Sequence, residues 1–301
     1  MRAAVIHETG DPDVLRIEEA DRPEPGDGEV LMRVHAASVN PVDWKYRRGF
    51  MEQTLPAVLG RDASGNVEQS SDSRFAAGDE VFGHTSSGAY GEYATASADV
   101  VAKKPDGLSH EQAAAIPVAG LTAWQALFDK GGLESGQTVL IAGAAGGVGH
   151  FAVQFAARVA GARVIGTGSS RNRDFVLGLG ADEYVDYTQQ DVAEAASDVD
   201  IAFDTVGGDV TPSLVPTVRE SGAIITIASP PPEEAARERG ARAELHVTMP
   251  NPEQLTQIAE LVVSGEVRVE LTEVLPLDEV ARAHELSESG HTRGKIVLKV
   301  A

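Results

Sequence analysis

The pattern of hydrophobic and polar positions changes its period near residue 143. The run Thr138 to Ala142 is short, apolar and rich in β-branched residues, which is typical of a buried strand. Apolar residues then recur at helical spacing, at Val148, Phe151, Ala152, Phe155, Ala156 and Val159. Glycines occupy the change itself, at Gly143, Gly146, Gly147 and Gly149. The pattern therefore predicts a strand, a glycine turn and a helix.

Strand and helix patterns continue to alternate after this element. Apolar runs of strand length lie at Arg163 to Thr167, Tyr184 to Tyr187, Val199 to Phe203 and Ala223 to Ile227, with a candidate sixth at Ala243 to Val247. Helical stretches separate them, and such alternation predicts a parallel, doubly wound sheet. Residues 2 to about 105 read instead as short strands divided by turn signals, for example the alternating segment Glu29 to Val39.

The remaining segments are assigned by caps and periodicity. A capping-box spacing at Ser109 predicts a short helix that Pro117 ends, followed by a second helix from Leu121 to about Lys130. An amphipathic helix is predicted over Pro252 to Val263. The tail is expected to return to short strands around Val280 to Leu286 and to rejoin the first lobe.

The glycine turn predicts an anion site. Free N–H groups and the positive end of the helix dipole favour the diphosphate of a dinucleotide, with contacts at Ala144, Gly146, Gly147 and Val148. Enzymes that prefer NAD place an acid about 20 residues further on to hold the ribose 2′-OH.

The second predicted strand ends without such an acid. Hydroxyls and arginines stand there, at Ser169, Ser170, Arg171 and Arg173, which suits a 2′-phosphate and favours NADPH. The alternative is that Arg171 and Arg173 form a solvated helix start with no specific role.

Composition and net charge indicate which kinds of molecule the protein can bind. The net charge is −21, from 46 acidic and 25 basic residues, which disfavours nucleic acid and anionic membranes and leaves small molecules or a second copy of the chain. No apolar run reaches about 18 residues and the first residues lack a signal-peptide pattern, so a cytoplasmic location is expected. The few lysines suit a halophilic source, and an ordinary acidic surface is the equally weighted alternative.

Four segments resemble one family over essentially the whole chain. They are Ser38-Val-Asn-Pro-Val-Asp-Trp-Lys45, Leu59-Gly-Arg-Asp-Ala-Ser-Gly65, Pro117-Val-Ala-Gly-Leu-Thr-Ala-Trp124 and Ala142-Gly-Ala-Ala-Gly-Gly-Val-Gly149. This set resembles the zinc-free branch of the medium-chain dehydrogenase/reductase superfamily, with its quinone oxidoreductases, zeta-crystallins and enone oxidoreductases. The resemblance implies an α/β protein with a GroES-like β-barrel catalytic lobe, 1–118 and 266–301, and a Rossmann NADPH-binding domain, 119–265.

The resemblance also implies that no catalytic metal is bound. Zinc-dependent members carry Cys, His and Cys at the positions that Asn40, Arg61 and Val118 occupy here, and the chain contains no cysteine at all. Hydride would then pass from NADPH to a quinone or an α,β-unsaturated carbonyl, with protein donors stabilising the developing enolate.

Candidate catalytic residues follow from the same match. Asn40 and Lys45 are the expected donors and Asp43 the organiser of the loop or of the nicotinamide ribose; the alternative is that Asn40 and Asp43 only cap a turn. Lysine at position 45, where quinone oxidoreductases often have tyrosine, favours enones. Further cofactor contacts implied by the resemblance are Thr122, Tyr187, Val206, Ser229 and Lys295.

The resemblance also bears on the oligomeric state and on the class of function. Relatives commonly dimerise through their nucleotide-binding domains, so a homodimer is expected. A different class of function stays open, namely an NADPH-binding sensor or a crystallin-like structural protein without significant turnover.

Overall fold

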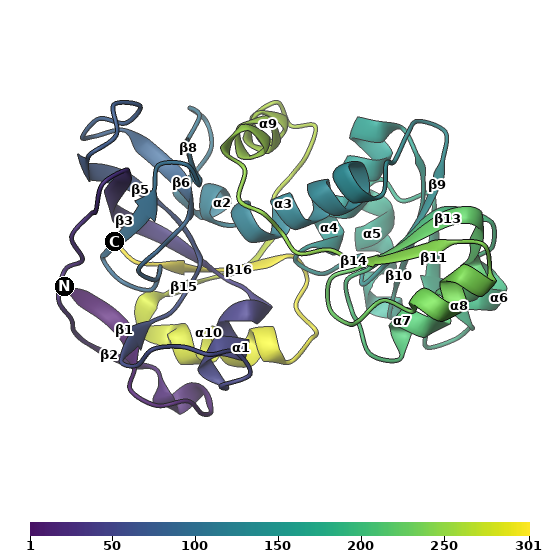
Figure 1. Ribbon diagram of the computed structural model, residues 1–301, viewed down its shortest axis with the longest axis horizontal. Helices are drawn as coiled ribbons and strands as arrows, with labels where there is room; N and C mark the ends of the chain where they lie inside the picture. Colours follow the sequence, from purple (N-terminus) through teal and green to yellow (C-terminus); the bar gives the residue numbers. More distant parts are fainter. The chain divides into compact units, whose positions relative to one another are not determined.

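The computed structural model describes residues 1–301 and divides into two compact units. The first unit comprises Met1–Leu121 and Pro250–Ala301, and the second comprises Thr122–Met249 (Figure 1). The predicted limits of the nucleotide-binding domain, 119 and 265, are therefore too wide. Helix α9 (Pro252–Val263) belongs to the first unit because it packs on β8 (Val101–Lys103), and its Ile258 lies against Gly120.

The second unit is built on six parallel strands. Their spatial order is β11, β10, β9, β12, β13, β14. The chain thus adds β10 and β11 on one side of β9, then crosses over and adds β12, β13 and β14 on the other side. This is the order of a doubly wound dinucleotide-binding sheet. The strands are β9 (Thr138–Ala142), β10 (Arg163–Gly168), β11 (Glu183–Asp186), β12 (Val199–Asp204), β13 (Val218–Thr226) and β14 (Arg242–Leu245). The predicted parallel sheet is confirmed, including its sixth strand.

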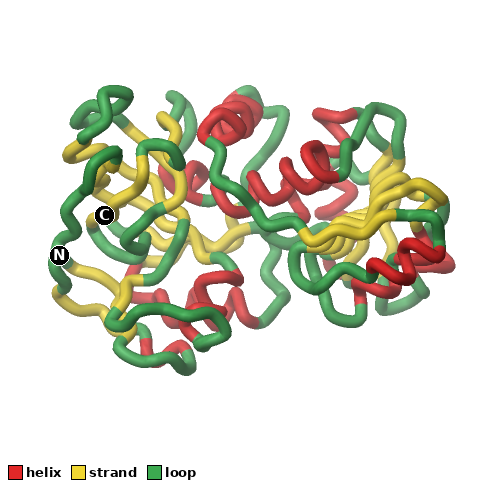
Figure 2. The backbone as a smooth tube through the Cα atoms, in the orientation of Figure 1, coloured by secondary structure: helices red, strands yellow, loops and turns green.

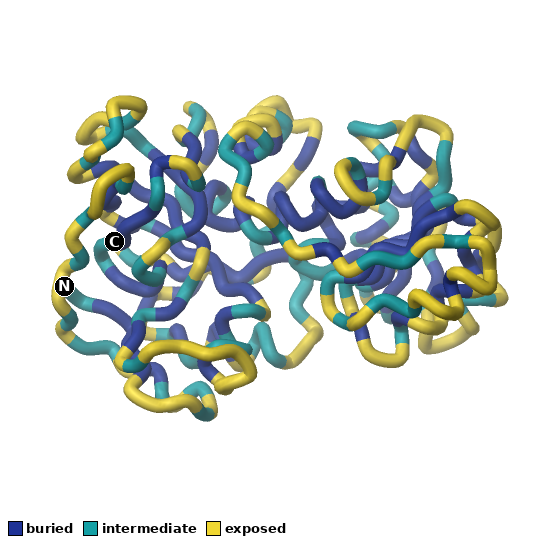
Figure 3. The backbone as a smooth tube through the Cα atoms, viewed as in Figure 1, coloured by how far each residue is buried: buried dark blue, intermediate teal, exposed yellow.

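Short helices connect these strands and lie on both sides of the sheet (Figure 2). They are the π-helical turns η2 (Gln125–Lys130) and η3 (Phe155–Ala160), η4 (Ser170–Asn172), η5 (Val215–Thr217), α4 (Gly149–Gln154), α5 (Arg173–Leu179), α6 (Val192–Ala195), α7 (Val210–Ser213) and α8 (Glu233–Glu238). The central strands β9 and β12 are almost wholly buried, because helices cover both faces of a parallel sheet (Figure 3).

The first unit is β-rich, as predicted. A seven-stranded sheet has the order β15, β16, β3, β5, β6, β8, with β7 also paired to β3, and a three-stranded sheet has the order β2, β1, β4. The strands are β1 (Arg2–Ile6), β2 (Arg16–Glu19), β3 (Glu29–Val39), β4 (Ala57–Val58), β5 (Asp62–Ser70), β6 (Glu80–His84), β7 (Tyr93–Ser97), β15 (Leu271–Pro276) and β16 (Lys295–Lys299), besides β8. The helices are η1 (Pro12–Val14), α1 (Pro41–Arg47), α2 (His110–Ala114), α3 (Pro117–Trp124), η6 (Leu277–Glu279) and α10 (Val280–Glu288), besides α9.

The C-terminal strand returns to the first lobe as expected. Strand β16 pairs antiparallel with β3, and the register places Ile296 opposite Val39. Lys295 and Asn40 are the next residues along this register, so strand pairing brings together two side chains from opposite ends of the chain.

Two local predictions are wrong. The helix predicted from Ser109 does end before Pro117, but the second helix, predicted from Leu121, already begins at Pro117, which suits proline because the first helical residue has no intrahelical N–H bond to lose. The segment predicted as strands around Val280 to Leu286 is helix α10, in which Val280, Ala283 and His284 are buried. Their spacing of three and four is the helical period, which the short apolar run obscured.

Close backbone packing explains the glycines of the turn after β9. Gly143 has a φ of +75°, and a Cβ added at Gly149 would lie 2.1 Å from the carbonyl oxygen of Gly143. The carbonyl of Gly143 also accepts the Gly146 N–H at 2.9 Å. Only glycine at position 149 lets α4 begin this close to the end of β9.

Two glycine substitutions test this packing. Gly149→Ala forces a methyl group against backbone, so we expect it to lower the free energy of unfolding by about 2 kcal/mol or more. Gly178→Ala, on exposed helix α5 where an added Cβ meets nothing within 4 Å, should be neutral or stabilising by up to about 1 kcal/mol. Urea unfolding of both variants measures the difference; equal midpoints would contradict the packing argument.

Candidate functional site

A buried polar cluster in the first unit centres on Asn40. Its backbone N–H donates to Asp43 Oδ2 at 2.8 Å, and its side-chain Nδ2 donates to Asp62 Oδ2 at 2.8 Å. Its Oδ1 accepts from the Lys295 ammonium at 2.6 Å. The residue lies at the end of β3 and at the N-cap of α1, and it is 1% exposed. One amide therefore links a carboxylate to an ammonium inside the protein.

Lys295 is held by this cluster. Its side chain is buried, and its Nζ lies 3.4 Å from the Val39 carbonyl oxygen in addition to the bond with Asn40. Burial lowers the pKa of Lys295, and the negative charges of Asp62 and Asp43 oppose that effect. Its predicted contact with the cofactor stays a prediction.

Asp43 is the other titrating member of the cluster. Its Oδ2 accepts the Asn40 N–H and the Tyr90 hydroxyl, the latter at 2.9 Å, while its Oδ1 has no hydrogen-bond partner. Burial, assisted by the charge of Asp62, raises the pKa of Asp43 to about 7, against the hydrogen bonds that lower it. Asp43 therefore caps α1, in agreement with the alternative that Asn40 and Asp43 cap a turn. With a pKa of about 7, it is also partly protonated at neutral pH.

Asp62 is a site residue that sequence reasoning did not single out. It is fully buried at the start of β5, and its Oδ2 accepts both the Asn40 amide and the backbone N–H of Val118 at 3.1 Å. His84 Nε2 lies 3.8 Å from its Oδ1. The signal that could have revealed it is an acid opening a strand whose next three residues are all buried.

Lys45 lies outside this hydrogen-bonded cluster. Two residues beyond Asp43 on α1, it is half-buried, and its ammonium lies 5.9 Å from the centre of the Trp44 ring. It makes no ion pair within 4 Å. Of the three predicted catalytic residues, the fold thus brings Asn40 and Asp43 together and leaves the Lys45 ammonium available.

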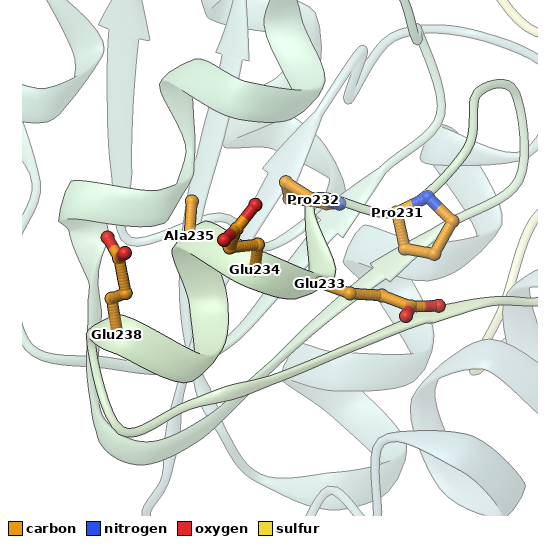
Figure 4. A pocket seen from close by; sticks show the side chains of 6 residues that line it. All are labelled: Pro231, Pro232, Glu233, Glu234, Ala235 and Glu238. Atoms are coloured by element: carbon orange, nitrogen blue, oxygen red, sulfur yellow. The ribbon is translucent and has the colours of Figure 1, made fainter.

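A hollow of about 410 Å³ adjoins Asp43 within the first unit. It is lined by Gln53, Thr54, the segment from Pro56 to Arg61 and the segment from Thr85 to Gly88, together with Asp43 and Tyr46. A second hollow, of about 590 Å³, lies at the start of α8 in the second unit, where Figure 4 shows Glu233, Glu234 and Glu238 beside two prolines. Its side chains offer no donor to an anion.

The glycine turn of the second unit fits a diphosphate. Because Gly149 has no Cβ, the helix starts directly against the backbone of the turn, and helical residues continue from Gly149 to Ala160, so the N-terminal end of this helix lies at the turn. Ala144 packs under it, 3.1 Å from where a Cβ of Gly166 on β10 would lie. The predicted contacts Gly146, Gly147 and Val148 all belong to this turn.

The predicted 2′-phosphate contacts gather where β10 and β11 end. Ser169 precedes the short helix η4, in which Ser170 and Arg171 are exposed, and the Tyr187 backbone N–H donates to the Gly168 carbonyl at 3.3 Å. Tyr187 itself is 58% exposed. One neighbour was not foreseen: Asp186, whose carboxylate accepts from the Ser170 hydroxyl, a bond that together with Thr188 lowers the pKa of Asp186.

The remaining predicted contacts lie in the second unit, two of them in loops and Thr122 in helix α3. Val206 follows β12 and donates its N–H to Asp204 at 2.9 Å, and Ser229 follows β13 and accepts the Gly208 N–H at 2.6 Å. Thr122 contacts the Thr248 hydroxyl. The loops that carry Val206 and Ser229 lie at the carboxyl edge of the sheet, where doubly wound folds bind ligands.

Comparison with known proteins decides the family. Residues 26–106 match the family described as alcohol dehydrogenase GroES-like domain, and residues 179–298 match zinc-binding dehydrogenase. The chloroplast envelope quinone oxidoreductase homolog of Arabidopsis thaliana is 34% identical over 92% of this chain and 91% of its own. The chain belongs to the zinc-free quinone oxidoreductase branch of the medium-chain dehydrogenase/reductase superfamily.

Two further members of the superfamily support this placement. The structure of the quinone oxidoreductase from Coxiella burnetii has a TM-score of 0.94 and 38% identity, covering 100% of this chain and 99% of that one. The NADPH-dependent alkenal/one oxidoreductase of A. thaliana chloroplasts is 32% identical over 99% of this chain and 79% of its own. In this chain no group of three or more His, Cys, Asp or Glu side chains is placed to hold a metal, and no helix is long and apolar enough to cross a membrane.

The raised pKa of Asp43 predicts a pH-dependent stability. Burial raises the pKa of Asp43 from its ordinary value of 3.8 to about 7, so the stabilising contribution of the neutral acid is complete below pH 3.8 and is lost as the pH rises through 7. Asp43→Asn cannot ionise, so we expect its free energy of unfolding, relative to wild type, to rise by on the order of 3 kcal/mol between pH 4.5 and 7.5.

Urea unfolding at both pH values measures this change. Asp13→Asn, at an exposed carboxylate of η1, is the matched control and should show no such rise. A difference between Asp43→Asn and wild type that stays constant with pH would mean that Asp43 is ionised throughout.

Proposed function

We propose that this protein is an NADPH-dependent, zinc-independent oxidoreductase that reduces quinones or α,β-unsaturated carbonyls. The observation that carries the proposal is the Asn40 cluster. Where zinc-dependent members have a ligand, the Asn40 amide is fully engaged with Asp62 and Lys295, and Val118 contributes only a backbone N–H. The residues at these positions therefore bond to one another within the protein and do not form a set of metal ligands, so a donor outside the cluster must stabilise the developing charge.

The cofactor would be held by the second unit. The amides of the glycine turn suit the diphosphate, and Ser170, Arg171 and Tyr187 suit the 2′-phosphate. NADPH, when bound, supplies the hydride. The similar alkenal/one oxidoreductase of A. thaliana is named as NADPH-dependent, so that relative uses the same cofactor.

In the first unit the expected donors separate into two roles. Both side-chain atoms of Asn40 already bond within the protein, so Asn40 positions its neighbours. Lys45 keeps a free ammonium, which stabilises the oxygen of a conjugated carbonyl as negative charge develops on it. Asp43, whose pKa burial raises to about 7, lines the hollow of the first unit. Lys45 therefore carries the electrostatic part of the proposal.

We also propose that the protein forms a homodimer through β14. This strand is the edge of the six-stranded sheet and pairs only with β13. Its last residue and the chain that follows expose apolar side chains, with Leu245 at 47%, Val247 at 68% and Met249 at 66%. Unpaired edges and exposed apolar patches of this kind are typical of association surfaces.

Enzyme kinetics test the proposed reaction. The purified protein should oxidise NADPH in preference to NADH with a panel of enones and quinones, and EDTA should leave the rate unchanged. Lys45→Met should lower kcat for an enone at least 10-fold, about 1.4 kcal/mol of transition-state stabilisation. Lys299→Met, at an exposed lysine of β16, is the control. NADPH binding without turnover across the panel would instead favour a sensor.

Light scattering tests the dimer. Wild type should have twice the mass of the chain, and Val247→Glu should shift it to the monomer at micromolar concentration, because the charge would be buried in the interface. Val274→Glu introduces the same charge at a similarly exposed valine of β15, 45% exposed, and should leave the mass unchanged. A wild-type monomer, or equal effects of the two variants, would exclude this interface.

A further inference from the structure

The hollow beside Asp43 has an unusual set of side chains. Arg61 is its only base and Asp43 its only acid. The other polar side chains around it are hydroxyls and amides, at Tyr46, Gln53, Thr54, Thr85, Ser86 and Ser87. Hydroxyls and amides can donate hydrogen bonds, so the hollow presents donors around one positive charge.

The backbone that carries Arg61 is fixed on both sides. Gly60 has a φ of +93°, and a Cβ at this position would lie 2.6 Å from the buried Tyr90 ring. The Arg61 carbonyl accepts the Thr85 N–H at 2.7 Å, and the Thr85 hydroxyl donates to the Gly60 carbonyl at 3.2 Å. The turn that opens β5 is thus tied to the segment that forms the other wall of the hollow.

The guanidinium of Arg61 is exposed and has no carboxylate partner. It lies 6.0 Å from the centre of the Tyr46 ring and makes no ion pair within 4 Å, although the chain carries 46 acidic residues. A net charge of −21 repels small anions from the surface, so an anionic ligand needs a local cation. Asp43 is the only acid that lines the hollow, and burial raises its pKa to about 7, which weakens its repulsion of an anion; the Asp62 carboxylate is buried and bonded to Asn40 and to the Val118 N–H.

We infer that Arg61 binds a carboxylate of the substrate, so that the acceptor is an α,β-unsaturated carbonyl that also carries a carboxylate. Arginine offers paired N–H donors that match the two oxygens of a carboxylate, and the hydroxyl of Ser86 lines the same hollow. This inference rests on the proposed function for the reacting group. The anion site itself involves the first unit alone.

Calorimetry with an unreactive pair of ligands tests the anion site. We use 4-oxopentanoate and its methyl ester, which both lack the reducible double bond; the ester differs from the acid by one methyl group, which removes the negative charge. Wild type should bind the acid at least 10-fold more tightly than the ester. Arg61→Gln should abolish that preference by weakening the acid alone, and Arg61→Lys should restore only part of it, because lysine is a point charge.

Arg16→Gln is the matched control for loss of charge. Arg16 is also exposed and makes no ion pair, but it lies on β2 and does not line the hollow. It should bind the acid as wild type does. Equal binding of acid and ester by wild type, or equal losses in Arg61→Gln and Arg16→Gln, would overturn the inference. Thermal unfolding of each variant confirms that it is folded.

Kinetics with (E)-4-oxopent-2-enoate and its methyl ester separate the two proposals. If both hold, Arg61→Gln raises KM for the acid at least 10-fold and changes neither kcat nor KM for the ester substantially. Turnover of both compounds with equal KM overturns the carboxylate site and leaves the reductase intact. Arg61-dependent binding of 4-oxopentanoate without turnover of either enone supports the carboxylate site and removes the reductase.

Discussion

The antiparallel pairing of β16 with β3 is the constraint on which the first unit depends. It places Lys295 beside Asn40, a separation of 255 residues along the chain. A buried ammonium on its own costs several kcal/mol, so the fold must bring an acceptor and an opposite charge to it. Asn40 supplies the acceptor, and Asp62 supplies the charge on the other side of the same amide.

This arrangement joins four segments that carry the predicted chemistry. The end of β3, the start of β5, the start of β16 and the start of α3 all contribute an atom, the last through the Val118 N–H bonded to Asp62. Asp43 extends the cluster to Tyr90. Removing any one member would leave a buried polar group without a partner, which is costly in a low-dielectric interior. The cluster therefore holds the ends of β3 and β16 together and fixes the position of Asp43 beside the hollow.

Local patterns were enough to predict the second unit, because each of its strands is a short apolar run and its glycine turn is one continuous motif. The first unit was harder. Asp62 and Lys295 become partners only through strand register, and register is not visible in a single sequence. Helix α10 was missed because Val280 to Leu286 is short, and short apolar runs are ambiguous between helix and strand. The cytoplasmic location and the salt-adapted source expected from composition stay predictions.

Arg61 and Asp62 show how one short segment can serve both the interior and the hollow. They are consecutive at the entry to β5, and successive side chains of an extended segment point to opposite faces. Asp62 consequently turns inward to Asn40, while Arg61 remains exposed at the hollow. Position 61, which by the family resemblance holds a metal ligand in zinc-dependent members, thus holds a cation here. The neighbouring acid, Asp62, positions Asn40 and the Val118 N–H. A cation at this place suits a carboxylate on the acceptor and disfavours a bound metal, since two positive charges repel each other across the same hollow.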